Sequence, residues 1–95
     1  MDVTVDPAVA GRNDVHVYIK DRQGRADTRY KTASFRLSLP AQQLGPIAKD
    51  GVKAGPGHFQ LVGAAMQLPG EWTITVIVQP DRFTETRATV RVTLR

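Results

Sequence analysis

The chain of 95 residues contains no cysteine. This absence excludes disulfide bonds, thiolate zinc sites, iron–sulfur clusters and thiol nucleophiles. Long apolar runs are also missing, since the longest nearly apolar stretch covers only residues 74–78 and a membrane-spanning helix needs about 20 residues. The first residues have neither the basic start nor the apolar stretch of a signal peptide. We therefore expect neither a spanning helix nor a leader in this sequence.

What the chain contains is the composition of one globular domain. Hydrophobic residues make up 41% and charged residues 23% of a 10.4 kDa chain, which is typical of a folded soluble protein. A chain of this size buries about 60–65% of its unfolded surface, which favours a binding or structural module over an enzyme with a deep pocket. We predict a single domain over residues 1–95, with Met1 either a natural start or the first residue of an excised domain.

Apolar and polar residues alternate along most of the chain, the period expected of half-buried strands. No window shows the 3.6-residue period of an amphipathic helix, and Pro and Gly interrupt the alternation at short intervals. Strands are expected at residues 3–6, 15–20, 33–39, 46–52, 57–62, 71–78 and 87–95. The pattern predicts an all-β fold, an immunoglobulin-like antiparallel β-sandwich of six or seven short strands. An open barrel is the alternative architecture.

The aromatic residues Phe35, Phe59 and Trp72 fall on the inward register of these strands. Antibody-type domains pack such a tryptophan against a disulfide, which this chain cannot form. We expect Trp72 to be the central core aromatic instead. Pro69 and Gly70, just before it, suit a type II turn that leads into the strand.

The basic excess is a second feature of the composition. Thirteen Lys and Arg against nine Asp and Glu give a net charge of +4. Arg36, Arg87, Arg91 and Arg95 fall on the outward register of their strands. A nucleic-acid surface adds exposed aromatics or a recognisable reading module, and neither is evident, so we expect these arginines to face solvent and no nucleic acid to bind.

Catalysis is not expected from the residues present. Asp50, Glu71, Asp81 and Glu85 fall at predicted turns and strand ends, where short acidic side chains favour turn geometry. Ser34 and Ser38 lie outside any nucleophile-elbow motif. The Gly55-Pro56-Gly57 turn lacks the lysine and the helix of a phosphate-binding loop. We therefore predict that the protein is not an enzyme.

Metal binding would have to use imidazole and thioether ligands. If the domain holds copper, the residues expected to bind it are His16, His58 and Met66, because His and Met are the copper ligands that remain without cysteine. His16 lies on the polar face of a strand and His58 follows a turn. Their separation in sequence forms no local motif, so the simpler interpretation is one exposed strand histidine and one turn histidine.

Five short segments, used here as landmarks, occur in an order and spacing that is similar to a known family. They lie at residues 11–18, 44–46, 55–59, 68–74 and 81–85. Their order and spacing resemble the C-terminal extracytoplasmic domain of bacterial copper resistance protein D (CopD/YcnJ-type copper transport proteins). More loosely, the chain is similar to YtkA-like and FixH-like small β domains. The best match is the Pro-Gly-Glu-Trp segment, and the resemblance covers almost the whole chain.

The resemblance implies an immunoglobulin-like domain displayed outside the cytoplasmic membrane and tethered to it, excised here from a larger membrane protein. The function implied is that of a non-enzymatic accessory domain in copper transport or resistance. Its expected partners are the membrane-embedded part of the parent protein and a periplasmic copper carrier, and copper is the ion it would bind. The alternative function is a generic adhesion or spacer module with no metal role.

Overall fold

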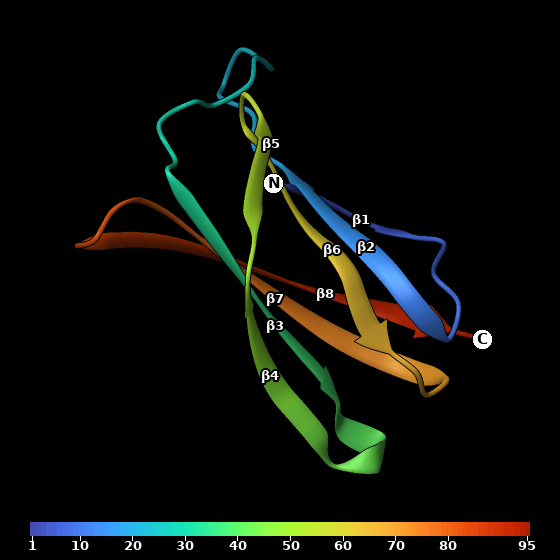
Figure 1. Ribbon diagram of the computed structural model, residues 1–95. Helices are drawn as coiled ribbons and strands as arrows, with labels where there is room; N and C mark the ends of the chain where they lie inside the picture. The colour runs from blue at the N-terminus through green and yellow to red at the C-terminus, as the bar shows by residue number, and fades with distance from the viewer.

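The computed structural model describes residues 1–95 as eight strands and one short 3-10 helix. The elements are β1 (Asp2–Asp6), β2 (Gly11–Tyr18), β3 (Thr32–Leu39), η1 (Pro40–Gln42), β4 (Leu44–Asp50), β5 (Val52–Gly55), β6 (His58–Met66), β7 (Gly70–Asp81) and β8 (Thr84–Leu94). They form two antiparallel four-stranded sheets, in the orders β1-β2-β6-β5 and β4-β3-β7-β8, which pack face to face (Figure 1). The predicted all-β sandwich is confirmed, whereas its immunoglobulin-like type stays a prediction. No helix of the molecule has the length and apolar character needed to cross a membrane.

The strand count is eight rather than the predicted six or seven. The difference lies between η1 and β6, where one edge strand at residues 46–52 was expected and two strands, β4 and β5, are present. The chain leaves one sheet after Asp50 and joins the other at Val52, so the two strands follow each other along one edge (Figure 1). Gly51 permits this crossing because a Cβ atom there would lie 2.5 Å from the Phe35 ring.

The hydrophobic core fills the space between the sheets. The alternation predicted for β2, β3, β6 and β7 is confirmed, since their inward side chains are buried. The largest fully buried side chains are Trp72, Phe35 and Phe59. The Trp72 indole also donates a hydrogen bond of 2.9 Å from Nε1 to the Leu68 carbonyl. The predicted central role of Trp72 in the core is therefore confirmed.

A buried asparagine holds the connection between β1 and β2. Asn13 is 1% exposed, and its Oδ1 accepts a hydrogen bond from the Ala8 amide at 2.8 Å. Its Nδ2 donates to the Val9 carbonyl at 2.9 Å and to the Gly11 carbonyl at 3.4 Å. The β2–β6 pairing shifts register directly after Asn13, so this side chain fixes both the turn and the start of the strand.

Replacing Asn13 with Ala is expected to destabilise the fold by about 1–3 kcal/mol, because the polar backbone groups of the turn lose their partner inside the protein. The measurement is the urea midpoint compared with that of the wild type. Gln42→Ala, at an exposed position of η1, is the control and should leave the midpoint unchanged. Equal midpoints for both variants would contradict the structural role of Asn13.

Candidate functional site

The two histidines of the chain meet on the outward face of the β1-β2-β6-β5 sheet. β2 and β6 are neighbours in this sheet (Figure 1), with His16 opposite Gln60 and Tyr18 opposite His58. His16 and His58 are therefore diagonal neighbours across the pair of strands, within reach of long and aromatic side chains. The expectation of two separate histidines is wrong, and the cause is the antiparallel register, which joins residues 42 positions apart.

The rings make direct contact. His16 Nδ1 and His58 Nε2 lie 3.0 Å apart and share one hydrogen bond, so one ring nitrogen carries the proton and the other accepts it. The Tyr18 ring stacks on His58 with the centroids 4.2 Å apart and an interplanar angle of 16°. His16 and His58 are half-buried and Tyr18 is exposed. The three side chains form a cluster that solvent reaches from the outside of the sandwich.

Met66, the third ligand expected for copper, does not join this cluster. It is the last residue of β6 and His58 is the first. Met66 pairs with Gly11 at the start of β2, whereas His58 pairs with Tyr18 at its end. The Met66 side chain is completely buried in the core, because its position in the alternation of β6 points inward. The pairing of β2 with β6 brings His16 and His58 together, whereas the Met66 thioether lies in the core, away from them.

The residues paired directly with the two histidines are uncharged. They are Thr4 and Gln60 opposite His16, and Tyr18 and Gly55 opposite His58. No group of three or more His, Cys, Asp or Glu side chains lies close enough together to hold a metal ion. The site therefore offers two imidazole nitrogens, and the other coordination positions of a bound ion would be left to solvent or to a partner.

The pKa of His58 lies below its ordinary value. Burial is the larger cause, because it disfavours the imidazolium, and the nearby His16 ring is the smaller cause. In the unfolded chain the pKa of a histidine is about 6.5, so the unfolded state binds more protons below that pH. The stabilising contribution of neutral His58 to the free energy of unfolding should therefore be present above about pH 6.5 and be lost as the pH falls below that value.

Removing His16 should raise the pKa of His58 toward its ordinary value without restoring it fully, because burial remains. The measurement is an NMR titration of the His58 ring protons in the wild type and in His16→Gln. Tyr18→Leu tests the other cause, since loss of the stacked ring exposes His58 and should also raise its pKa. An unchanged His58 midpoint in both variants would contradict these two causes.

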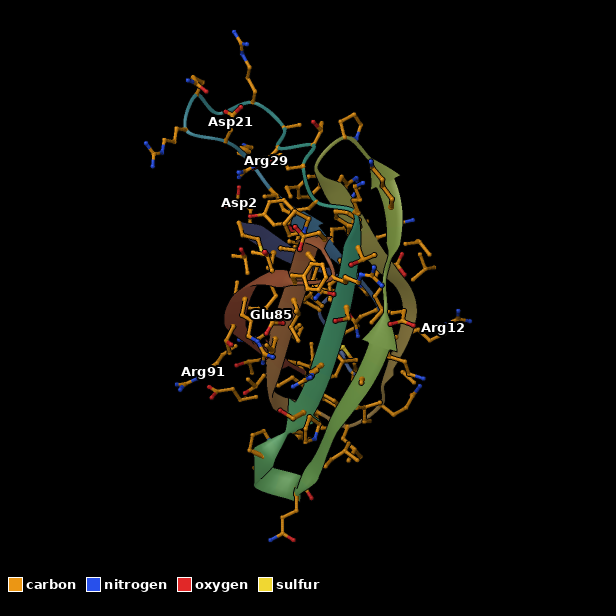
Figure 2. The ribbon with its side chains drawn as sticks, turned by 90° about the vertical axis from the view of Figure 1, so that its left-hand side faces the viewer. Asp2, Arg12, Asp21, Arg29, Glu85 and Arg91 are labelled. Carbon is orange, nitrogen blue, oxygen red and sulfur yellow. The ribbon has the colours of Figure 1, made fainter.

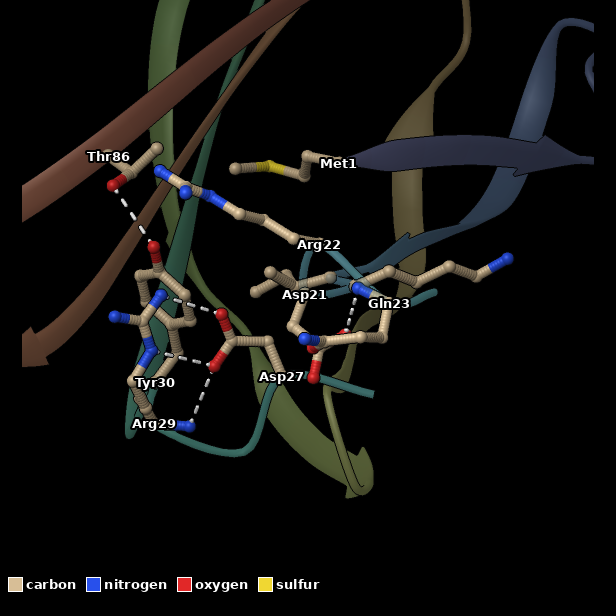
Figure 3. A pocket seen from close by; sticks show the side chains of 10 residues that line it. Met1, Asp21, Arg22, Gln23, Asp27, Arg29, Tyr30 and Thr86 are labelled. Carbon is tan, nitrogen blue, oxygen red and sulfur yellow. Dashed lines mark hydrogen bonds and ion pairs between the residues drawn. The ribbon is translucent and has the colours of Figure 1, made fainter. Parts of the chain in front are cut away.

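A second feature is a polar hollow at the end of the sandwich where the β2–β3 connection lies (Figure 3). Its volume is about 580 Å³, and Met1, Arg22, Tyr30 and Thr86 are among the residues that line it. Tyr30 Oη and Thr86 Oγ1, both on its wall, lie 3.3 Å apart. The lining residues come from three separate segments of the chain, so no sequence motif predicts this hollow.

An ion pair organises the wall of this hollow. The buried Asp27 carboxylate accepts hydrogen bonds from Arg29 Nε at 3.0 Å and from an Arg29 terminal nitrogen at 2.8 Å (Figure 3). These bonds, with a further one from the Arg29 backbone amide, lower the pKa of Asp27. Both the side chain and the backbone amide of Arg29 bind the Asp27 carboxylate. These bonds hold residues 27–29 of the loop in one conformation.

The remaining arginines face solvent, as predicted. Arg36, Arg87, Arg91 and Arg95 are all exposed. Arg91 and Arg12 project from opposite sides of the sandwich (Figure 2). Arg87 pairs with Glu85 at 3.1 Å on β8, so part of the positive charge of this sheet is neutralised locally.

No protein-family model, curated protein or solved structure matches the chain.

Proposed function

We propose that this protein is a non-enzymatic extracytoplasmic accessory domain of a copper transport or resistance membrane protein, and that His16 and His58 hold the copper ion. The single observation that supports copper binding is the 3.0 Å separation of His16 Nδ1 and His58 Nε2. The order of landmarks along the chain, from residues 11–18 to 81–85, supports the role in copper transport.

Copper is the ion that a site of this composition favours. Neutral imidazole is a common ligand of copper, zinc and nickel, and among the divalent ions copper binds a given set of nitrogen ligands most strongly. A site with only two protein ligands binds most metal ions weakly. We therefore assign it to the ion with the strongest intrinsic preference for nitrogen.

The parts of the cluster have different roles. His16 and His58 bind the ion, while Tyr18 orients the His58 ring by stacking on it. The cluster lies on the outward face of a sheet, where an incoming protein can reach it. We propose a periplasmic copper carrier and the membrane-embedded part of the parent protein as its partners.

The test is equilibrium dialysis of the full chain against copper salt, followed by metal analysis of the protein compartment. The wild type should retain one copper ion per chain, whereas His16→Ala with His58→Ala should retain none. Met66→Leu is the matched control, because it alters the expected thioether ligand while filling the core with similar volume. Equal retention by the double histidine variant would reject the site, and loss of retention in Met66→Leu would reject the assignment of ligands.

An adhesion or spacer module is the second candidate function. The observation that favours it is Phe83, which is 87% exposed at the tip of the β7–β8 hairpin and offers an aromatic contact for another protein. The sequence of the parent protein would distinguish the two functions. A preceding segment with several spanning helices favours the copper role, and tandem β-sandwich repeats favour the spacer.

A further inference from the structure

We infer that the His16–His58 pair takes copper as Cu(II), in two adjacent coordination positions, and discriminates against two-coordinate Cu(I). This inference rests on the proposed function and adds the oxidation state of the ion. It follows from the spacing of the two nitrogens, from the restraint on the rings, and from the lack of cysteine together with the burial of Met66.

The spacing of the donors is the first argument. Metal–imidazole bonds are about 2.0 Å long, so two nitrogens bound at a right angle lie about 2.8 Å apart and two bound on opposite sides lie about 4.0 Å apart. His16 Nδ1 and His58 Nε2 are 3.0 Å apart. This separation fits adjacent positions of the tetragonal geometry that Cu(II) prefers. A linear ion with two ligands needs the nitrogens to separate by about a further 1 Å.

The second argument is that the rings are held in place. The His58 ring is stacked on Tyr18, and its backbone pairs with β2 on one side and β5 on the other. His16 lies on β2, an inner strand that pairs with both β1 and β6. Opening the pair to a linear arrangement would disturb the stacking on Tyr18. Binding in adjacent positions breaks the N–H···N hydrogen bond. The donor ring then carries its proton on its other nitrogen, which frees both lone pairs for the ion, and the rings pivot near their present places.

The third argument is the chemistry of the donors. Soft thiolate and thioether ligands favour Cu(I), whereas imidazole suits the harder divalent ion. The chain has no cysteine, Met66 is buried in the core, and Met1 lines the hollow at the β2–β3 end. Neither a thiolate nor the thioether of Met66 therefore supplements the two nitrogens. Water or a ligand from the copper carrier would fill the remaining positions of Cu(II).

The experiment measures both oxidation states on the full chain. Copper(II) sulfate is added to the protein, and electron paramagnetic resonance reports the number of nitrogen ligands. In a parallel anaerobic titration, Cu(I) competes between the protein and a chromophoric Cu(I) chelator. The His16→Ala, His58→Ala double variant serves as the blank for copper held elsewhere on the chain. We expect a two-nitrogen Cu(II) spectrum absent from the blank, and at least about tenfold weaker retention of Cu(I) than of Cu(II).

Tyr18→Leu tests the restraint on the rings. Without the stacked ring the pair can open, so the preference for Cu(II) over Cu(I) should shrink by about tenfold, while the two-nitrogen Cu(II) spectrum persists. Cu(I) held as tightly as Cu(II) by the wild type would overturn the inference and leave the copper function intact. Failure of both ions to bind above the blank would overturn the inference and the proposed function together. An unchanged preference in Tyr18→Leu would overturn the role of the stacking.

Discussion

Replacing Trp72 with Ala is expected to destabilise the protein by about 3–5 kcal/mol. The Trp72 side chain is 1% exposed and is the largest fully buried side chain in the molecule. Its removal leaves a cavity between the sheets and also frees the Leu68 carbonyl, which accepts the indole hydrogen bond. Small domains have total stabilities of about 5–15 kcal/mol, so this one change removes a large part of the stability.

The measurement is equilibrium unfolding in urea, with the midpoint compared between the wild type and Trp72→Ala. Phe83→Ala is the matched control, because it also truncates an aromatic side chain but at a position that is 87% exposed. We expect the control to stay within about 0.5 kcal/mol of the wild type. Similar midpoints for the two variants would show that Trp72 does not fill the core. They would also contradict the register that places Trp72 on the inward face of β7.

The sequence was most informative in β7, where apolar and polar residues alternate from Glu71 to Val76. In β7 the alternating side chains Trp72, Ile74, Val76 and Val78 are all buried, as the period of two requires. A shift of one residue would turn this whole set toward solvent, so the hydrophobic effect allows only one face. Such information is local, and it predicted the sandwich and its core.

The division of β4 from β5 was not predictable in the same way. Most side chains of these strands are exposed, because both lie at a sheet edge and bury little apolar surface. The crossing at Gly51 depends on the close approach of the Phe35 ring, which belongs to a strand of the other sheet. A pattern along the chain cannot report that contact.

The histidine cluster was missed for a related reason. His16 and His58 were both recognised as candidate ligands, but their contact depends on how β2 and β6 pair. That pairing places Tyr18 opposite His58, and a slip of one residue would send one histidine to the opposite face of the sheet. The outward position of His16 was readable from the alternation in β2. Only the three-dimensional register brings the second ring to it.

Gly57→Ala should be the second most damaging change, at about 2–4 kcal/mol of stability. Gly57 is buried and has a φ of +63°, a conformation that costs about 1–2 kcal/mol for a residue with a Cβ atom. A Cβ atom there would also lie 2.7 Å from the Ile19 carbonyl oxygen and 3.0 Å from the Asp27 nitrogen. These are backbone atoms, which cannot turn aside as a flexible side chain could.

The crowded contact joins three parts of the fold. The Gly57 carbonyl accepts a hydrogen bond of 2.8 Å from the Ile19 amide, and the Ile19 carbonyl accepts one of 2.8 Å from the Asp27 amide. Displacing the Ile19 carbonyl therefore loosens the β2–β3 loop and the segment that leads into His58 at once. We expect the Gly57→Ala variant to lose copper retention along with stability, because His58 follows directly in the chain.

Gly24→Ala is the control that separates the cost of a positive φ from the cost of the close contact at Gly57. Gly24 also has a positive φ, +81°, but nothing lies within 4 Å of the position where its Cβ would be. The control thus bears the conformational cost alone, about 1 kcal/mol, and the difference between the two variants measures the close approach at Gly57. Urea midpoints that fall equally in both would mean that backbone conformation explains the whole effect. The tight contact between Gly57 and Ile19 would then have no part in holding His58 beside His16.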